Sequence, residues 1–152
     1  MTQFNHPAEL TGEAKKAVDA LLNAGEVLKN QTVLLKGVNA AGRTMGELLK
    51  GLTRWGIAPY YIFQCRPVSG VGGHFQVPLT EGYRIVEEAK QFQNGPGKCV
   101  RYVMSHVTGK IDILGQLPDG QMLFKYHQAM YDRDRSRIFT QALAPGQTWL
   151  AD

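Results

Sequence analysis

The stretch QTVLL at residues 31–35 decides the fold class of this 152-residue chain. It is apolar and partly β-branched, it does not alternate with polar residues, and turn-forming residues flank it, which is typical of a strand buried on both faces. Strands of this kind occur in parallel sheets, because the crossover helices of such sheets cover both faces. We therefore expect an α/β fold built on a parallel sheet.

Amphipathic helices are predicted on either side of this strand. Apolar residues recur at helical spacing over residues 10–22, where Thr11 is placed to cap the helix and Gly25 to end it. A second helical stretch covers residues 45–55 and ends at Gly56. Each stretch has one apolar side, so we expect both helices to pack against the sheet.

The strand and helix unit repeats further along the chain. A second buried strand is predicted at residues 60–64 and a third at residues 99–104. Between them, a glycine-rich loop at residues 69–74 precedes a helix that we expect to begin near Pro78. Repeated units of this length favour parallel strands joined by right-handed crossovers.

The carboxyl-terminal part follows a different pattern. Residues 111–126 predict a β-hairpin, because two alternating segments flank a turn, and residues 137–143 predict one further strand. No linker divides the chain, so we expect one domain over residues 1–152, with a β-rich extension at 111–152. Since three units cannot close an eight-stranded barrel, residues 1–110 are expected to form half of a partial (β/α) barrel with parallel strands, followed by the β-hairpin region.

The composition excludes several classes of protein. Hydrophobic residues make up 43% of the chain, yet no apolar run approaches the roughly 20 residues of a membrane-spanning helix. The net charge of +4 comes from scattered basic residues, and the one cluster, at residues 133–137, is interrupted by Asp134. We therefore expect neither a nucleic-acid nor a membrane partner. Cys65 and Cys99 are too few for a disulfide framework, and no secretion leader is evident, which favours the cytoplasm.

Four motifs occur in order along the chain: NHPAE at residues 5–9, NQTVLLKGVN at 30–39, PYYIFQC at 59–65 and HFQVP at 74–78. In sequence and spacing they resemble the lysine 2,3-aminomutase family, over roughly residues 2–117. The resemblance implies a radical S-adenosylmethionine enzyme that uses pyridoxal phosphate to move an amino group between adjacent carbons of an amino acid.

Members of that family bind a [4Fe-4S] cluster through a three-cysteine motif, which this sequence lacks. The chain therefore resembles only the carboxyl-terminal half of the family's catalytic domain, and cluster chemistry would need a missing amino-terminal half. We expect the chain to pair with that half or to form a homo-oligomer. No metal site is expected within the chain itself, because Ala40 and Ala41 stand where relatives commonly have an aspartate and, in some members, a zinc-binding cysteine.

The resemblance also implies roles for single residues. Lys110, which follows Gly109, matches the catalytic lysine that forms a Schiff base with pyridoxal phosphate; without the resemblance it would read as a solvated hairpin lysine. Gln31 matches a glutamine at the adenosylmethionine site, although a strand-start amide also satisfies backbone groups. His6 is expected either to contact a cofactor or to cap the following helix.

Two further positions concern the amino acid substrate. Arg66 and His106 stand where lysine aminomutases have aspartates that hold the distant ammonium group of lysine. The exchange reverses the local charge, so we expect a substrate other than lysine, with an acidic side chain that Arg66 binds in a bidentate manner. In the alternative, Arg66 points to solvent. The second hypothesis for the whole chain is a non-catalytic truncated fragment or a scaffold that binds a partner.

Overall fold

The computed structural model describes residues 1–151. In chain order these residues form the following elements: η1 (Pro7–Glu9), α1 (Gly12–Asn23), β1 (Lys29–Leu34), α2 (Gly42–Arg54), β2 (Ala58–Gln64), α3 (Leu79–Gln91), α4 (Gly95–Lys98), β3 (Arg101–His106), β4 (Gly109–Gln116), β5 (Met122–Ala129), η2 (Asp132–Asp134) and β6 (Ile138–Gln141). In this part of the chain no helix combines the length and the hydropathy that crossing a membrane requires.

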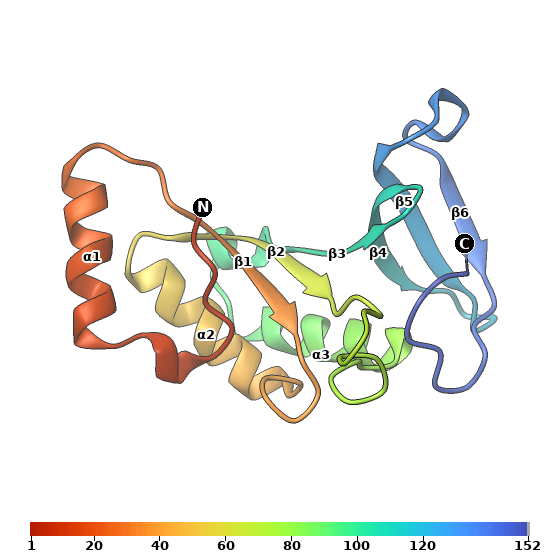
Figure 1. Ribbon diagram of the computed structural model, residues 1–152, viewed down its shortest axis with the longest axis horizontal. Helices are drawn as coiled ribbons and strands as arrows, with labels where there is room; N and C mark the ends of the chain where they lie inside the picture. The colour runs from red at the N-terminus through yellow and green to blue at the C-terminus, as the bar shows by residue number, and fades with distance from the viewer. Residues whose placement is uncertain (152) are drawn as a thin grey trace.

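All six strands belong to one sheet in the order β1-β2-β3-β4-β5-β6. The first three strands are parallel, and each later strand is antiparallel to the one before it. Figure 1 shows the antiparallel strands at the end of the sheet far from α1, and the sheet stays open. The predicted α/β fold, with parallel strands followed by a hairpin region, is confirmed; the strands do not close into a barrel.

Helices α2 and α3 lie on the same side of the sheet (Figure 1). Apolar side chains from the helices, such as Leu48 and Val86, pack there against Leu34 and Ile62 of the strands, and all four are fully buried. The prediction that residues 31–35 are buried on both faces was wrong. Both crossover helices return on one side, so the described chain provides no helix layer for the opposite face, and Val33 in β1 is only half-buried there.

The local helix signals behave largely as predicted. The hydroxyl of Thr11 accepts a hydrogen bond from the backbone N–H of Ala14, and Gly25 takes the positive φ that ends the α1 turn. Pro78 is the residue before the first turn of α3 rather than a member of it. Residues 95–98, for which no helix was predicted, form the short helix α4, capped by Asn94.

The amino-terminal residues run beside β1 in the parallel direction, as the end of a strand would. Thr2 forms a bridge with Asn30, whose buried amide also bonds both backbone polar groups of Phe4. The side chain of Asn5 accepts from the N–H of Val33. Side-chain amides therefore continue the ladder where backbone pairing stops.

Candidate functional site

The face of the sheet opposite α2 and α3, here called the open face, carries a group of polar and aromatic side chains around Lys110. Strand alternation places them there, since register partners in neighbouring strands point to the same side. Its members are Gln31, Val33, Tyr60, Tyr61, Phe63, Arg101, Lys110, Asp112, Lys125 and His127.

Lys110 lies near the start of β4 and its amine faces two aromatic rings of β2. The Nζ atom is 4.5 Å from the ring centroid of Tyr61 and 5.6 Å from that of Phe63. The side chain is half-buried, and the nearby rings attract the ammonium form through their π faces. The predicted catalytic amine therefore points into the open face rather than away from the sheet.

Gly109 explains why the chain can turn so tightly before this lysine. Its φ is 140°, and a Cβ atom built there would lie 2.1 Å from the carbonyl oxygen of Gln128 in the paired strand. Only glycine fits such a close approach of two backbones. The glycine that precedes Lys110 is thus required by the hairpin.

Gln31 is the register partner of Tyr61 in the parallel pair β1 and β2. The ring that contacts the Lys110 amine therefore stands between that amine and Gln31. The structure brings these two predicted cofactor-binding residues to one face, on strands β1 and β4, with β2 and β3 between them.

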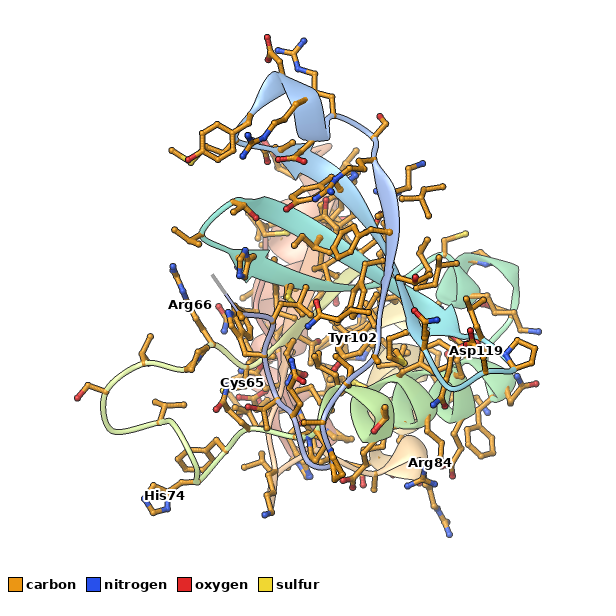
Figure 2. The ribbon with its side chains drawn as sticks, turned by 90° about the vertical axis from the view of Figure 1, so that its right-hand side faces the viewer. Cys65, Arg66, His74, Arg84, Tyr102 and Asp119 are labelled. Atoms are coloured by element: carbon orange, nitrogen blue, oxygen red, sulfur yellow. The ribbon has the colours of Figure 1, made fainter. Side chains whose placement is uncertain are left out.

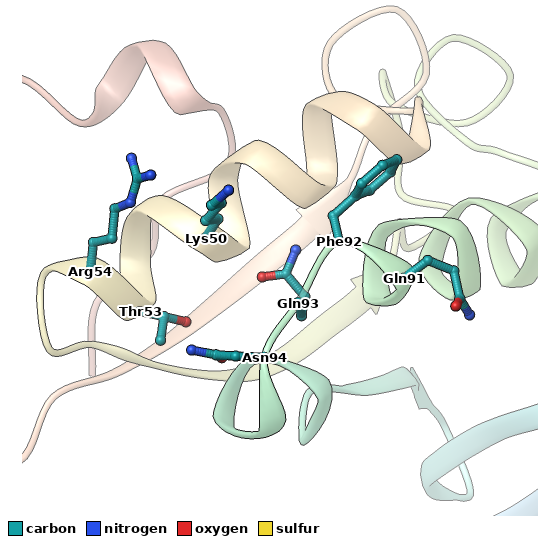
Figure 3. Close-up of a pocket in the computed structure, with 7 residues that line it drawn as sticks. All are labelled: Lys50, Thr53, Arg54, Gln91, Phe92, Gln93 and Asn94. Carbon is teal, nitrogen blue, oxygen red and sulfur yellow. The ribbon is translucent and has the colours of Figure 1, made fainter.

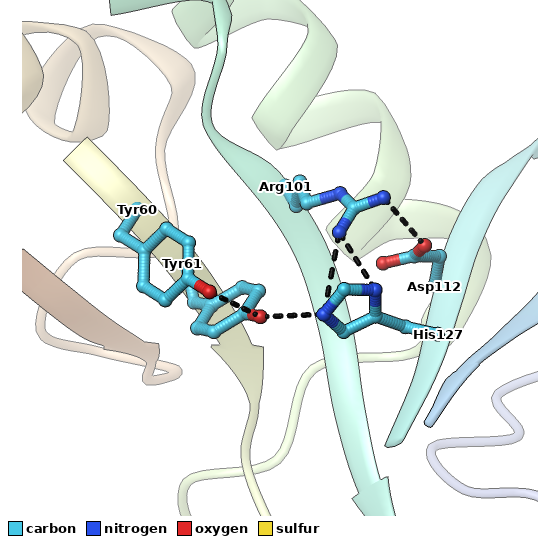
Figure 4. A network of polar contacts seen from close by, with 5 residues as sticks. All are labelled: Tyr60, Tyr61, Arg101, Asp112 and His127. Atoms are coloured by element: carbon cyan, nitrogen blue, oxygen red, sulfur yellow. Dashed lines mark hydrogen bonds and ion pairs between the residues drawn. The ribbon is translucent and has the colours of Figure 1, made fainter. Parts of the chain in front are cut away.

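A polar network crosses the open face beside Lys110, and Figure 4 shows its five residues. Tyr61 donates to the hydroxyl of Tyr60 at 2.9 Å, and its own oxygen is 2.8 Å from Nε2 of His127. The guanidinium of Arg101 is 2.7 Å from Nδ1 of the same histidine and 3.4 Å from the carboxylate of Asp112. The network thus joins strands β2, β3, β4 and β5.

The protonation of this network follows from its surroundings. Burial and the hydrogen bond with Tyr60 raise the pKa of Tyr61 to about 12, so its hydroxyl keeps its proton at neutral pH. Partial burial and the adjacent Arg101 guanidinium lower the pKa of His127 below its ordinary value. The histidine is therefore neutral near pH 7 and can accept a hydrogen bond from the arginine.

Two β-bulges bring the network together. Between β1 and β2 the register shifts at Tyr60, so Tyr60 and Tyr61 both face the open side, with ring centroids 3.9 Å apart. Between β4 and β5 the register shifts again, and the extra residue is His127. Bulges commonly re-aim side chains at functional sites, and here each one adds a polar side chain to the open face.

The two predicted substrate-binding residues do not converge. Arg66 is exposed, and Figure 2 shows it at the start of the loop after Cys65, projecting away from the sheet. His106 points to the helix side of the sheet, opposite Lys110, where it is 8% exposed. Its Nδ1 atom is 2.8 Å from the hydroxyl of Thr108, and its ring lies 6.2 Å from that of Trp149.

His6 has a local structural contact. Its Nδ1 atom accepts from the backbone N–H of Ala8 at 3.1 Å and caps η1, while Thr11 caps the longer helix that follows. The sequence left open whether His6 contacts a cofactor or caps a helix, and the capping contact is present.

No group of three or more metal-ligating side chains occurs among residues 1–151. Cys65 is buried at the end of β2, where burial raises the pKa of its thiol, and Cys99 is exposed after α4. The two thiols lie at opposite ends of the parallel strands, so they offer no shared site.

A pocket of about 510 Å³ lies in the helix layer, between α2 and the turn after α3 (Figure 3). It contains the cationic Lys50 and Arg54 beside Phe92, but none of the predicted site residues. It is on the helix side of the sheet and is therefore separate from the open face.

Sequence reasoning missed all five members of the open-face network: Tyr60, Tyr61, Arg101, Asp112 and His127. Alternation within strands would have placed Arg101 and Asp112 on the face of Lys110. His127 has no partner at ligand spacing in the sequence, and the bulge that turns it toward Tyr61 leaves no local signal.

Comparison with known proteins gives one consistent group of relatives. No family model matches the chain. It is 42% identical, over its whole length, to an Aquifex aeolicus protein named "Putative L-lysine 2,3-aminomutase". Over 94 residues it is 44% identical to the L-lysine 2,3-aminomutase of Fusobacterium nucleatum and 42% identical to the glutamate 2,3-aminomutase of Clostridioides difficile, matches that cover 62% of this chain. The chain spans 40% of the length of the first relative and 22% of the other two.

Proposed function

Because this chain matches the carboxyl-terminal portion of the lysine 2,3-aminomutase family, we propose that it forms that part of a 2,3-aminomutase dependent on radical S-adenosylmethionine and pyridoxal phosphate. The observation that carries the proposal is the position of Lys110: its amine lies on the open face, over the Tyr61 ring, with Gln31 on the far side of that ring's strand. We place the protein in the cytoplasm, which its two free cysteines support.

The residues around Lys110 fit pyridoxal phosphate. The Lys110 amine is the group that would hold the cofactor covalently, and the rings of Tyr61 and Phe63 offer flat apolar surfaces beside it. When bound, this cofactor supplies an electron sink to the amino group that it carries. Lys110 binds and orients it, and the aromatic side chains exclude water from the linkage.

The residues of this chain suit S-adenosylmethionine better than they suit an iron–sulfur cluster. Gln31 carries an amide that can donate to and accept from the polar groups of S-adenosylmethionine. An iron–sulfur cluster does not fit the residues of this chain, because its only two cysteines are a buried one at position 65 and an exposed one at position 99. We therefore assign the cluster to an amino-terminal partner segment and derive no step through it.

For the substrate we propose an amino acid with an acidic side chain. The identity to a glutamate enzyme equals or approaches the identity to lysine enzymes, so overall similarity does not choose between them. The support is the charge of Arg66, whose guanidinium can bind a carboxylate in a bidentate manner; the side chain itself is exposed and projects away from the sheet. His106 contacts Thr108 and Trp149, and with Lys110 it lines a pocket of about 300 Å³.

The experiment that tests the proposal is trapping of the cofactor linkage. The full chain is incubated with pyridoxal phosphate and reduced with borohydride, and the modified peptide is identified by mass spectrometry. We expect the label on Lys110, with at least about tenfold less total labelling in Lys110→Ala. The matched control is Lys125→Ala, which removes an open-face lysine from the neighbouring strand and is expected to label normally.

The alternative function, a non-catalytic fragment or partner-binding scaffold, predicts a different result. It is favoured by the two cysteines of the sequence, which are too few to bind an iron–sulfur cluster and lie apart in the structure. Labelling spread over the surface lysines, unchanged in Lys110→Ala, would support the scaffold and reject cofactor binding at Lys110.

A further inference from the structure

The hydrogen bonds on the open face run in one direction, from Arg101 through His127 and Tyr61 to Tyr60. Arg101 has only donors, and its guanidinium lies 2.7 Å from Nδ1 of His127 and 3.3 Å from Nε2, so the nearer Nδ1 is assigned as the acceptor. The remaining ring proton is then on Nε2, which donates to the Tyr61 oxygen at 2.8 Å. Tyr61 in turn donates to Tyr60 at 2.9 Å. These roles assign one tautomer to His127.

The far end of this chain of contacts is anchored in the sheet. The Asp112 side chain is only 5% exposed, and its carboxylate lies 3.4 Å from the Arg101 guanidinium. One carboxylate oxygen of Asp112 has no hydrogen-bond partner among the described residues. The other oxygen, Oδ2, forms the ion pair with Arg101, and a buried carboxylate favours keeping that cation close.

The charges around His127 decide its protonation. Cations face it from three strands: Arg101 on β3, Lys110 on β4 and Lys125 on β5. Among the described residues, Asp112 on β4 is the carboxylate that acts on it, and the Tyr61 hydroxyl of β2, which keeps its proton, contacts it. The cations and partial burial outweigh the carboxylate, so the pKa of His127 is lowered and the ring stays neutral.

We propose that His127 is a positioning residue for the Lys110 amine and that it acts through Tyr61. By holding the Tyr61 hydroxyl, His127 fixes the ring over which the amine lies. Contact with the Tyr61 ring holds the Lys110 amine in position, and the hydrogen bond from His127 holds that ring in position. This role rests on the proposed function of Lys110, but it can be tested without any cofactor.

The test is NMR of the full chain after reductive ¹³C-methylation of its lysines, which keeps their positive charge. The Lys110 signal is identified by its loss in Lys110→Arg. Because the amine lies over two rings, we expect its methyl signal to be displaced upfield from those of exposed lysines. Tyr61→Leu, which removes the nearer ring, is expected to lose most of this displacement.

The histidine variants test the inference itself. His127→Leu removes both hydrogen bonds, and we expect the Lys110 signal to move most of the way toward the exposed lysines. His127→Gln keeps a donor and an acceptor and is expected to restore the wild-type position. Tyr61→Phe keeps the ring but loses the hydroxyl, so it should match His127→Leu, and the double variant should show no further change because both act through one contact.

A pH series gives a second readout. At pH values below the ordinary pKa of histidine, His127 takes up a proton, so its Nδ1 atom becomes a donor. It can then no longer accept from Arg101, and the contact breaks. We expect the Lys110 signal to shift in that range in the wild type but not in His127→Gln. A Lys110 signal that stays at its wild-type position in His127→Leu, in a variant whose amide spectrum shows it folded, overturns the inference. The proposed function fails separately, if pyridoxal phosphate does not label Lys110.

Discussion

At the residue scale, the structure depends on side-chain amides that replace backbone pairing at the end of the parallel strands. Asn39 is 1% exposed and makes three hydrogen bonds: it donates to the carbonyl groups of Asn5 and Val33 and accepts from the N–H of Leu35. One side chain thus joins the amino-terminal segment, β1 and the following turn.

Replacing this amide tests its contribution directly. Asn39→Ala leaves a buried backbone N–H and two carbonyl groups without their partner, so we expect the free energy of unfolding to fall by about 2 kcal/mol. Urea denaturation measures the change. The control is Asn23→Ala at the exposed end of α1, which should stay within about 0.5 kcal/mol of the wild type. Equal stability of both variants would show that water replaces the amide of Asn39.

The sequence could not predict this role of Asn39. The residues that it bonds are 4, 6 and 34 positions away, and the last of them is brought near only by the pairing of residues 2–5 with β1. Lys110 could be named from the sequence, because a resemblance and a preceding glycine both point to it, and its role stays a prediction. His127 was not, since its orientation depends on a bulge that leaves no trace in the local pattern.

At the scale of elements, the close approach of α3 to the sheet depends on a missing side chain. Gly82 is buried in α3, and a Cβ atom built there would lie 2.1 Å from the hydroxyl oxygen of Tyr102 in β3. That hydroxyl donates to Gln64, whose amide nitrogen bonds the carbonyl groups of Val77 and Thr148. The helix, two strands and the carboxyl-terminal segment therefore meet at one point.

Gly82→Ala should disturb this meeting point. Alanine favours helix by up to about 1 kcal/mol, but the clash costs more, so we expect a net loss of about 1–2 kcal/mol in the free energy of unfolding. Adding Tyr102→Phe removes the clashing atom and should recover part of the loss. Gly12→Ala, where nothing lies within 4 Å of the new Cβ, is the matched control and should not destabilise. Wild-type stability of Gly82→Ala would mean that α3 shifts freely.

The positions of the strands along the chain were easier to predict than which face of the sheet the helices cover. Strand β1 and the hairpin of β4 and β5 lie where apolar runs and alternation indicated, because those patterns report burial along one segment. The open face was mispredicted for a physical reason. An apolar strand shows that both of its sides avoid water, but it does not show whether a helix of the same chain or another polypeptide covers them.

At the scale of the whole molecule, the open face is a charged and aromatic surface at the centre of a sheet whose other face is covered. Its polar network and the amine of Lys110 are held in place without any layer above them from residues 1–151. The chain spans 40% of the length of the Aquifex aeolicus relative. The amino-terminal partner segment proposed above would cover this face.

That proposal predicts where a partner segment will bind. The part of the Aquifex aeolicus relative that lies outside the matched region is added as a separate polypeptide. The reactivity of the lysines toward an acylating reagent is then followed by mass spectrometry. We expect Lys110 and Lys29, whose amine lies 4.9 Å from the Tyr60 ring on the open face, to become about fivefold or more less reactive. Lys50 on the exposed side of α2 should not change, because the helix layer already separates it from that face. Protection of Lys50 alone would place the partner on the helix side. Unchanged reactivity at all three lysines would show that the open face does not bind this segment. Pairing between copies of the chain would then remain as the way to cover that face.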